Sequence, residues 1–123
     1  MKRFTILFLL ASGIAVIASS CRHEGVLPEQ QISFSVDIMP IISSGCQHSG
    51  CHGTQNTSDF ELLNYNDVMD HGDVKPGEPK SSKLYQTITG QGEEFMPAPP
   101  YPALTERNIK LIYIWIAQGA KDN

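Results

Sequence analysis

Two cysteines and a histidine lie close together in this sequence and could take part in covalent and metal chemistry. Cys46 and Cys51 are separated by four residues, and His52 follows the second cysteine directly. In the C-x-x-C-H pattern, two thiols form thioether bonds to the vinyl groups of haem, and the histidine becomes the proximal iron ligand. The spacing here is C-x4-C-H, and Ser49 and Gly50 let the longer loop bulge. The relation of His52 to Cys51 is unchanged. The sequence therefore predicts covalent haem on Cys46 and Cys51, with His52 as proximal axial ligand.

Two haem-free interpretations of these residues stay open. A disulfide between Cys46 and Cys51 would close so small a loop that it would stabilise the domain little. A zinc site could be built from Cys46, His48, Cys51 and His52. Structural zinc sites usually draw two ligand pairs from separated segments, and four ligands in so short a stretch would crowd a tetrahedron. Haem attachment explains the spacing better than either alternative.

A distal iron ligand must come from another part of the chain. The candidates are Met39, Met69, Met96, His48 and His71. Met96 lies in a loop that prolines stiffen, so it can present its thioether at small cost in conformational entropy. Met39 and Met69 lie on amphipathic stretches and are more typical of a core. We expect Met96 to be the distal axial ligand and keep His71 as the alternative.

These residues must be positioned by short helices and long loops. Apolar spacing and capping residues predict helices over about 37–45, 64–72, 82–90 and 105–118, with Asp37, Asn64, Ser81 or Ser82, and Thr105 as N-caps. No convincing two-residue strand period is present. The expected fold is all-α, with three to four short helices and long Gly/Pro loops around one haem. Because long loops leave little apolar core, we expect the cofactor to form the centre of the domain.

The N-terminal segment has the pattern of a secretory signal. Lys2 and Arg3 precede an apolar stretch over 4–18, which is shorter than the ~20 residues that span a membrane. Small residues precede Cys21, as in the lipobox of bacterial lipoproteins. We predict a lipoprotein signal peptide over 1–20, lipid on Cys21 and a flexible tether over 21–33. An ordinary signal peptidase site and an uncleaved anchor are the alternatives. With the lipid or the uncleaved anchor the protein would be held at a membrane, and in each case it would lie in the periplasm or at the outer cell surface.

The charge of the chain limits its partners. The sequence has 9 basic and 13 acidic residues and a net charge of −4. Removal of Lys2 and Arg3 with the signal peptide leaves 7 basic residues and a net charge of −6. So acidic a protein is not expected to bind nucleic acid. If charge steers a partner protein to it, that partner should present a basic docking surface.

The chain also resembles a known family over most of its length. The matching pieces are residues 34–42, Cys51-His52-Gly53, residues 75–84, Met96-Pro97 and residues 115–120. Their order resembles the Planctomycete-type cytochrome c domain and similar small bacterial lipoprotein cytochromes, although the C-x4-C-H spacing is longer than usual. The resemblance implies a cytochrome c-like haem domain over 34–120 with one covalent haem c, and it puts Met96 in the place of the ligand methionine.

The expected function is electron transfer rather than catalysis. Two strong axial ligands leave no open iron position for a substrate, and no evident acid–base pair supports peroxidase activity. The sequence therefore predicts an electron carrier, not an enzyme. A haem-based sensor and a cytochrome subunit of a larger dehydrogenase complex are alternatives. A haem-free lipoprotein with a Cys46–Cys51 disulfide is a weaker one.

Overall fold

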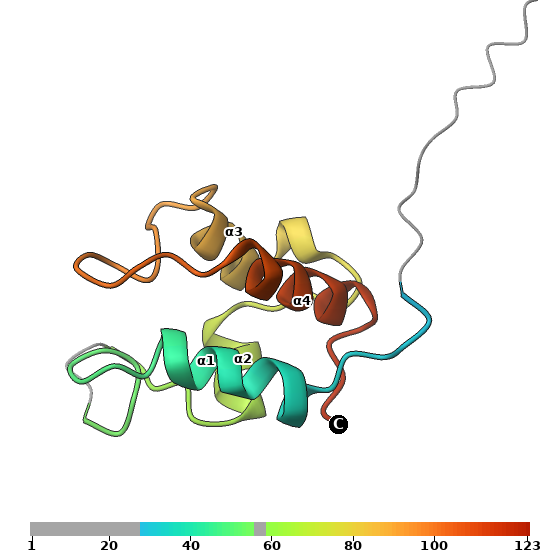
Figure 1. Ribbon diagram of the computed structural model, residues 1–123, viewed down its shortest axis with the longest axis horizontal. Coiled ribbons are helices and arrows are strands. Elements are labelled where there is room, and N and C mark those ends of the chain that lie inside the picture. Colours follow the sequence, from blue (N-terminus) through green and yellow to red (C-terminus); the bar gives the residue numbers. More distant parts are fainter. Residues whose placement is uncertain (1–27, 56–58) are drawn as a thin grey trace, which may run out of the picture.

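The computed structural model describes residues 28–55 and 59–123, and the regular elements within these ranges are all helices. In chain order they are the π-helix η1 (Phe34–Ile38), α1 (Met39–Gly45), α2 (Tyr65–His71), the 3-10 helix η2 (Pro79–Ser81), α3 (Lys83–Thr89) and α4 (Glu106–Ala117). Helix α4 runs roughly antiparallel to α1, as Figure 1 shows. The structure confirms the predicted all-α class with short helices and long loops.

The predicted signal peptide and the predicted lipid site at Cys21 lie outside the described residues. Within residues 28–55 and 59–123, no helix has the length and apolar character needed to cross a membrane.

The first helix starts earlier than the sequence suggested, because Ser33 rather than Asp37 is its N-cap. The hydroxyl oxygen of Ser33 accepts a hydrogen bond of 3.2 Å from the N–H of Val36. Asp37 lies within the helix and completes the cap, since its carboxylate accepts a 2.8 Å hydrogen bond from the N–H of Ser33. The prediction of Asp37 as N-cap was wrong, and the reciprocal pair resembles a capping box with the acid one position later.

Other helix ends follow the sequence prediction. Asn64 caps α2 by accepting a 3.1 Å bond from the N–H of Asp67. Thr105 caps α4 by accepting a 3.2 Å bond from the N–H of Asn108. Helix α3 ends at Gly90, whose φ of 70° suits glycine. Each cap depends on residues a few positions apart, which is why the sequence alone could predict it.

A contiguous apolar core lies between the helices. Its buried side chains are Phe34, Ile38, Ile41, Ile42, Leu62, Val68, Val74, Leu84, Ile88, Ile112, Trp115, Ile116 and Ala120. Trp115 is fully buried, and its indole N–H donates a 3.0 Å bond to the carbonyl of Lys121. The apolar core is therefore larger than the long loops suggested, and the expectation of a cofactor at the centre of the domain stays a prediction.

The N-terminal part of the described chain is hydrogen-bonded to the C-terminal part. The side-chain amide of Gln118 accepts a 2.8 Å bond from the N–H of Ile32 and donates one of 3.1 Å to the carbonyl of Gln30. The side-chain oxygen of Asn123 accepts a 2.8 Å bond from the N–H of Phe34. We call these contacts the terminal seam. In Figure 1 the seam lies at one end of the molecule, and the loops that follow α1 and α3 lie at the other.

Candidate functional site

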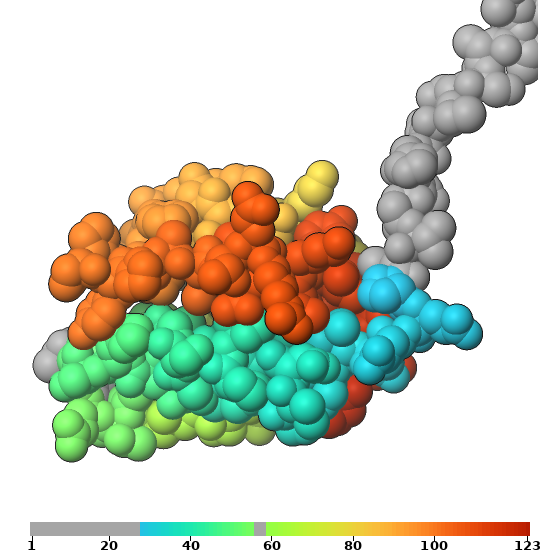
Figure 2. Space-filling view, viewed as in Figure 1, coloured from blue at the N-terminus to red at the C-terminus, as the bar shows by residue number. Residues whose placement is uncertain are grey.

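A pocket of about 1240 Å³ lies at the end of the molecule away from the terminal seam. It brings together the four side chains that the sequence proposed for haem, namely Cys46, Cys51, His52 and Met96. His48 and His71 also line it. Figure 2 shows the chain near residue 100 resting on the chain near residue 50 at this end. Pockets for small ligands usually measure ~300–1,000 Å³, so this one has room for a large planar ring.

The cysteines lie in a loop that its own backbone closes. We call residues 46–52 the cysteine loop. Cys46 ends α1, since its N–H donates a 2.8 Å bond to the carbonyl of Ile42. The N–H of His52 donates a 3.0 Å bond to the carbonyl of Cys46, and the N–H of Cys51 donates one of 2.8 Å to that of His48. The loop therefore keeps both thiols on one compact turn despite its two additional residues.

Glycine is required directly after the cysteine loop. A Cβ atom at Gly53 would lie 2.9 Å from the carbonyl oxygen of Gln47, which is closer than a methyl group can approach. The side-chain amide of Gln47 donates a hydrogen bond to the carbonyl of Leu62. The N–H of Leu62 in turn donates a 2.8 Å bond to the carbonyl of His52. The cysteine loop is thus fixed to the segment around Leu62, which belongs to the core.

Phe60 orients the imidazole of His52 in two ways. The Nδ1 atom of His52 lies 3.1 Å from the carbonyl oxygen of Phe60. A carbonyl only accepts, so this bond requires the proton on Nδ1, and Nε2 then carries the lone pair that binds metal. The two rings also stack, with centroids 4.4 Å apart and planes at 16°. Metal-binding histidines usually have such a hydrogen bond on the other nitrogen.

His71 lies on the far side of Phe60 from His52. The rings of Phe60 and His71 stack with centroids 4.6 Å apart and planes at 14°. Because both imidazoles stack on one phenyl ring, one lies on each of its faces. Phe60 therefore separates His71 from His52. This arrangement weighs against the two histidines as opposite ligands of a single iron.

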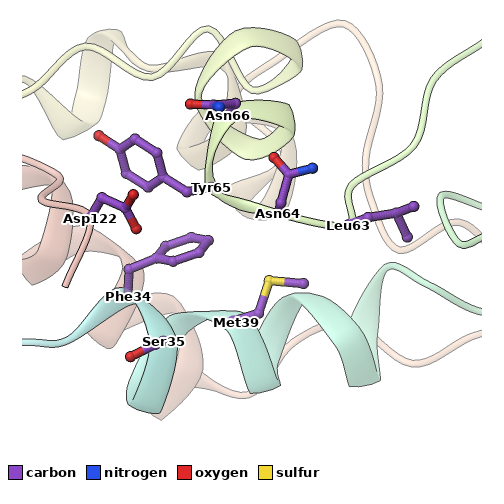
Figure 3. Close-up of a pocket in the computed structure, with 8 residues that line it drawn as sticks. All are labelled: Phe34, Ser35, Met39, Leu63, Asn64, Tyr65, Asn66 and Asp122. Atoms are coloured by element: carbon purple, nitrogen blue, oxygen red, sulfur yellow. The ribbon is translucent and has the colours of Figure 1, made fainter.

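Of the three methionines in the described range, Met96 is the one that lines this pocket. Its N–H donates a 3.2 Å bond to the carbonyl of Thr87 in α3. Met39 instead lines a separate pocket of about 400 Å³ beside Phe34 and Tyr65, shown in Figure 3. Met69 packs against the apolar core. All three side chains are half-buried, so it is the position of Met96 in this pocket that favours it as the distal ligand.

The structure has Cys46 and Cys51 as thiols rather than as a disulfide. Burial, followed by the neighbouring Cys51, raises the pKa of the Cys46 thiol to about 11. Cys46 is therefore protonated at neutral pH. Both thiols face the pocket, where they could form thioether bonds to a ligand that fills it.

The zinc interpretation has little support in the geometry. The ring of His48 stacks on Tyr101, whereas that of His52 stacks on Phe60. Among the described residues, no group of three His, Cys, Asp or Glu side chains converges as a metal site. One histidine and one methionine on a haem iron require no such group.

Sequence reasoning missed two features of the site. Phe60 carries no motif signal, because its role depends on a main-chain carbonyl that any residue could supply. The pair of His48 and Tyr101 joins loops far apart in the sequence, and residue spacing does not reveal such a contact. Comparison with protein-family models, with curated proteins and with solved structures found no match to this chain.

Proposed function

We propose that this protein is a monohaem c-type cytochrome with a cytochrome c-like fold, which carries single electrons outside the cytoplasm. One observation carries the proposal: Cys46, Cys51, His52 and Met96 line the same pocket. In this proposal Cys21 bears a lipid that holds the domain to a membrane.

The residues of the pocket fit haem c in number and type. Cys46 and Cys51 would hold the ring by thioether bonds, while Nε2 of His52 and the sulfur of Met96 would bind its iron. When bound, haem supplies an iron that changes its oxidation state by one electron. The carbonyl and ring of Phe60 fix the orientation of the His52 imidazole.

The apolar wall of the pocket suits a hydrophobic ring. Leu62, Leu84 and Ile88 are buried core residues that also line the pocket. They would exclude water from the face of the ring, which favours burial of an apolar macrocycle. Because His52 and Met96 would both bind the iron, the site would offer no open position to a substrate. This supports an electron carrier rather than an enzyme.

The charge around the pocket supports a basic redox partner. Its lining carries the acidic residues Asp59, Asp73, Glu93 and Glu94 and the basic residue Lys83. All five are exposed. A negative rim attracts a positively charged surface and raises the rate of productive encounters at low ionic strength.

Covalent haem is the direct test of the proposal. The full chain is expressed with a c-type maturation system, and the purified protein is extracted with acid and acetone. We expect haem to stay on the polypeptide, with a pyridine haemochrome spectrum typical of thioether-linked haem and a matching protein mass. The variant Cys46→Ala/Cys51→Ala is the control and should release any haem that it holds. Release of haem from the natural sequence, with an unmodified mass, would overturn the proposal.

A second measurement addresses the lipid. We expect the natural chain to fractionate with membranes and Cys21→Ser to be released or to stall in processing. If the variant stays membrane-bound with residues 1–20 intact, an uncleaved anchor replaces the lipid in the proposal.

A further inference from the structure

Two of the rings that line the pocket stack face to face. The centroids of His48 and Tyr101 lie 3.9 Å apart, and the planes differ by 3°. His48 belongs to the cysteine loop. Tyr101 belongs to residues 91–104 between α3 and α4, which we call the methionine loop. Both side chains are half-buried and line the pocket. The stack therefore joins the loop that carries the two thiols to the loop that carries Met96.

A second contact joins the same two parts of the chain. A Cβ atom at Gly45 would lie 2.7 Å from Cδ2 of Leu104, so the Leu104 side chain packs directly on the backbone that precedes Cys46. At the other end of the methionine loop, the N–H of Met96 is bonded to Thr87. In the sequence, Tyr101 lies between Met96 and Leu104. Its ring joins the methionine loop to the cysteine loop itself.

The cysteine loop, which is longer than usual, carries one ring of this stack. C-x-x-C places two residues between the cysteines, whereas this chain places four there. Gln47 ties the loop to Leu62, and His48 projects to Tyr101. Gly50, with φ of 78°, then turns the backbone back toward Cys51. The loop thus brings His48 to Tyr101 while its turn keeps both thiols in place.

We propose that the His48–Tyr101 pair is a clamp that holds the methionine loop over the pocket and keeps Met96 on the iron. The inference rests on the proposed function. His48 and Tyr101 are positioning residues rather than iron ligands. Loss of the stack frees the middle of the methionine loop, so the thioether leaves the iron more often and an external ligand competes more easily. The energy of an aromatic pair corresponds to a change of about two- to tenfold in such an equilibrium.

Competition by imidazole measures this effect in the oxidised holoprotein. Imidazole is titrated while the weak near-infrared band of the sulfur–iron bond is followed. We expect His48→Ala and Tyr101→Ala each to raise the apparent imidazole affinity about two- to tenfold. The imidazole affinity of the double variant should be only slightly higher than that of the stronger single variant, because both changes remove the same contact. His48→Phe and Tyr101→Phe keep stacking rings and should restore the natural affinity.

Tyr85→Ala is the matched control. Tyr85 is half-buried and pairs edge to face with Tyr113, at 5.4 Å, and it does not line the pocket. We expect its loss to leave imidazole affinity unchanged.

Each contrary result has a distinct meaning. If the natural protein carries no covalent haem, the proposed function fails and the clamp fails with it. If covalent haem and the sulfur–iron band are present but both alanine variants bind imidazole like the natural protein, only the clamp is overturned. Full additivity in the double variant would likewise overturn it, since the rings would then act independently. If one alanine variant does not acquire covalent haem, the imidazole affinities of the other alanine variant and of the phenylalanine variant at the same position test the clamp.

Discussion

The Nδ1 atom of His52 lies 3.1 Å from the carbonyl oxygen of Phe60, and the rings of the same two residues stack 4.4 Å apart. One residue thus fixes both the tautomer and the rotation of the imidazole. The contact depends little on side-chain flexibility, because its acceptor belongs to the main chain. A ligand oriented in this way binds metal with less loss of entropy and with a more basic Nε2.

The first prediction concerns this tautomer. In the reduced holoprotein, nitrogen–proton NMR should show the proton of His52 on Nδ1, with slow exchange against solvent. Phe60→Ala keeps the carbonyl but removes the stacked ring, so the same proton should persist and exchange faster. Phe60→Tyr, which keeps an aromatic face, is the control and should behave like the natural protein. An imidazole without a proton on Nδ1 would contradict the assignment.

The second prediction concerns the distal ligand. Met96→Ala should abolish the sulfur–iron band, open the reduced iron to carbon monoxide and lower the reduction potential by a sizeable part of the ~0.8 V range that axial ligands span. Met39→Ala and His71→Ala are the controls and should keep the band, since Met39 lies in another pocket and Phe60 separates His71 from His52. Loss of six-coordination in His71→Ala but not in Met96→Ala would identify a bis-histidine site. Carbon monoxide binding to the natural reduced protein would instead favour a sensor.

The third prediction concerns Gly53. Gly53→Ala places a methyl group against the carbonyl of Gln47, so we expect the free energy of unfolding of the holoprotein to fall by about 1–3 kcal/mol. Covalent haem content should fall as well, because the cysteine loop loses its shape. Gly92→Ala is the matched control, since its nearest contact would be an ordinary 3.5 Å. Chemical denaturation and haem absorbance measure both effects. Equal stability of the two variants would show that the backbone at Gly53 yields easily.

The fourth prediction concerns the Cys46 thiol in haem-free protein. Its pKa of about 11 leaves about one thiolate in a thousand at pH 8, and thiolate is the reactive form. Alkylation of Cys46 should therefore be slow at pH 8 and should accelerate about tenfold per pH unit until the pH approaches 11. Mass spectrometry of the cleaved protein follows the modification. The urea-unfolded chain, where burial is lost, is the reference. Equal rates at pH 8 in folded and unfolded protein would contradict the raised pKa.

Local sequence signals accounted for much of the fold. Asn64 and Thr105 cap their helices through bonds to residues three positions away, and Gly90 ends α3 by its own backbone preference. The first helix start was missed because Ser33 and Asp37 both suit a cap, and the apolar pattern does not choose between them. The extent of the core was also underestimated, since Leu62 and Val74 come from segments without helical spacing.

In the candidate site, too, some residues could be predicted from the sequence and others needed the structure. The cysteines and His52 stand out because attachment chemistry imposes a fixed local order. Met96 could be proposed because its loop is rich in proline. The stack of His48 on Tyr101 and the contact of His52 with Phe60 needed the structure, because each joins segments whose separation in sequence carries no pattern.

The terminal seam has a mechanical consequence. A pull on the chain that precedes Pro28 would act first on the hydrogen bonds of Gln118 and Asn123. From there the force would pass into α4, whose Trp115 is fully buried. The cysteine and methionine loops lie at the opposite end of the molecule, off this line of force (Figure 1). If the domain is anchored through its N-terminal segment, as proposed, tension on that segment would act far from His52 and Met96.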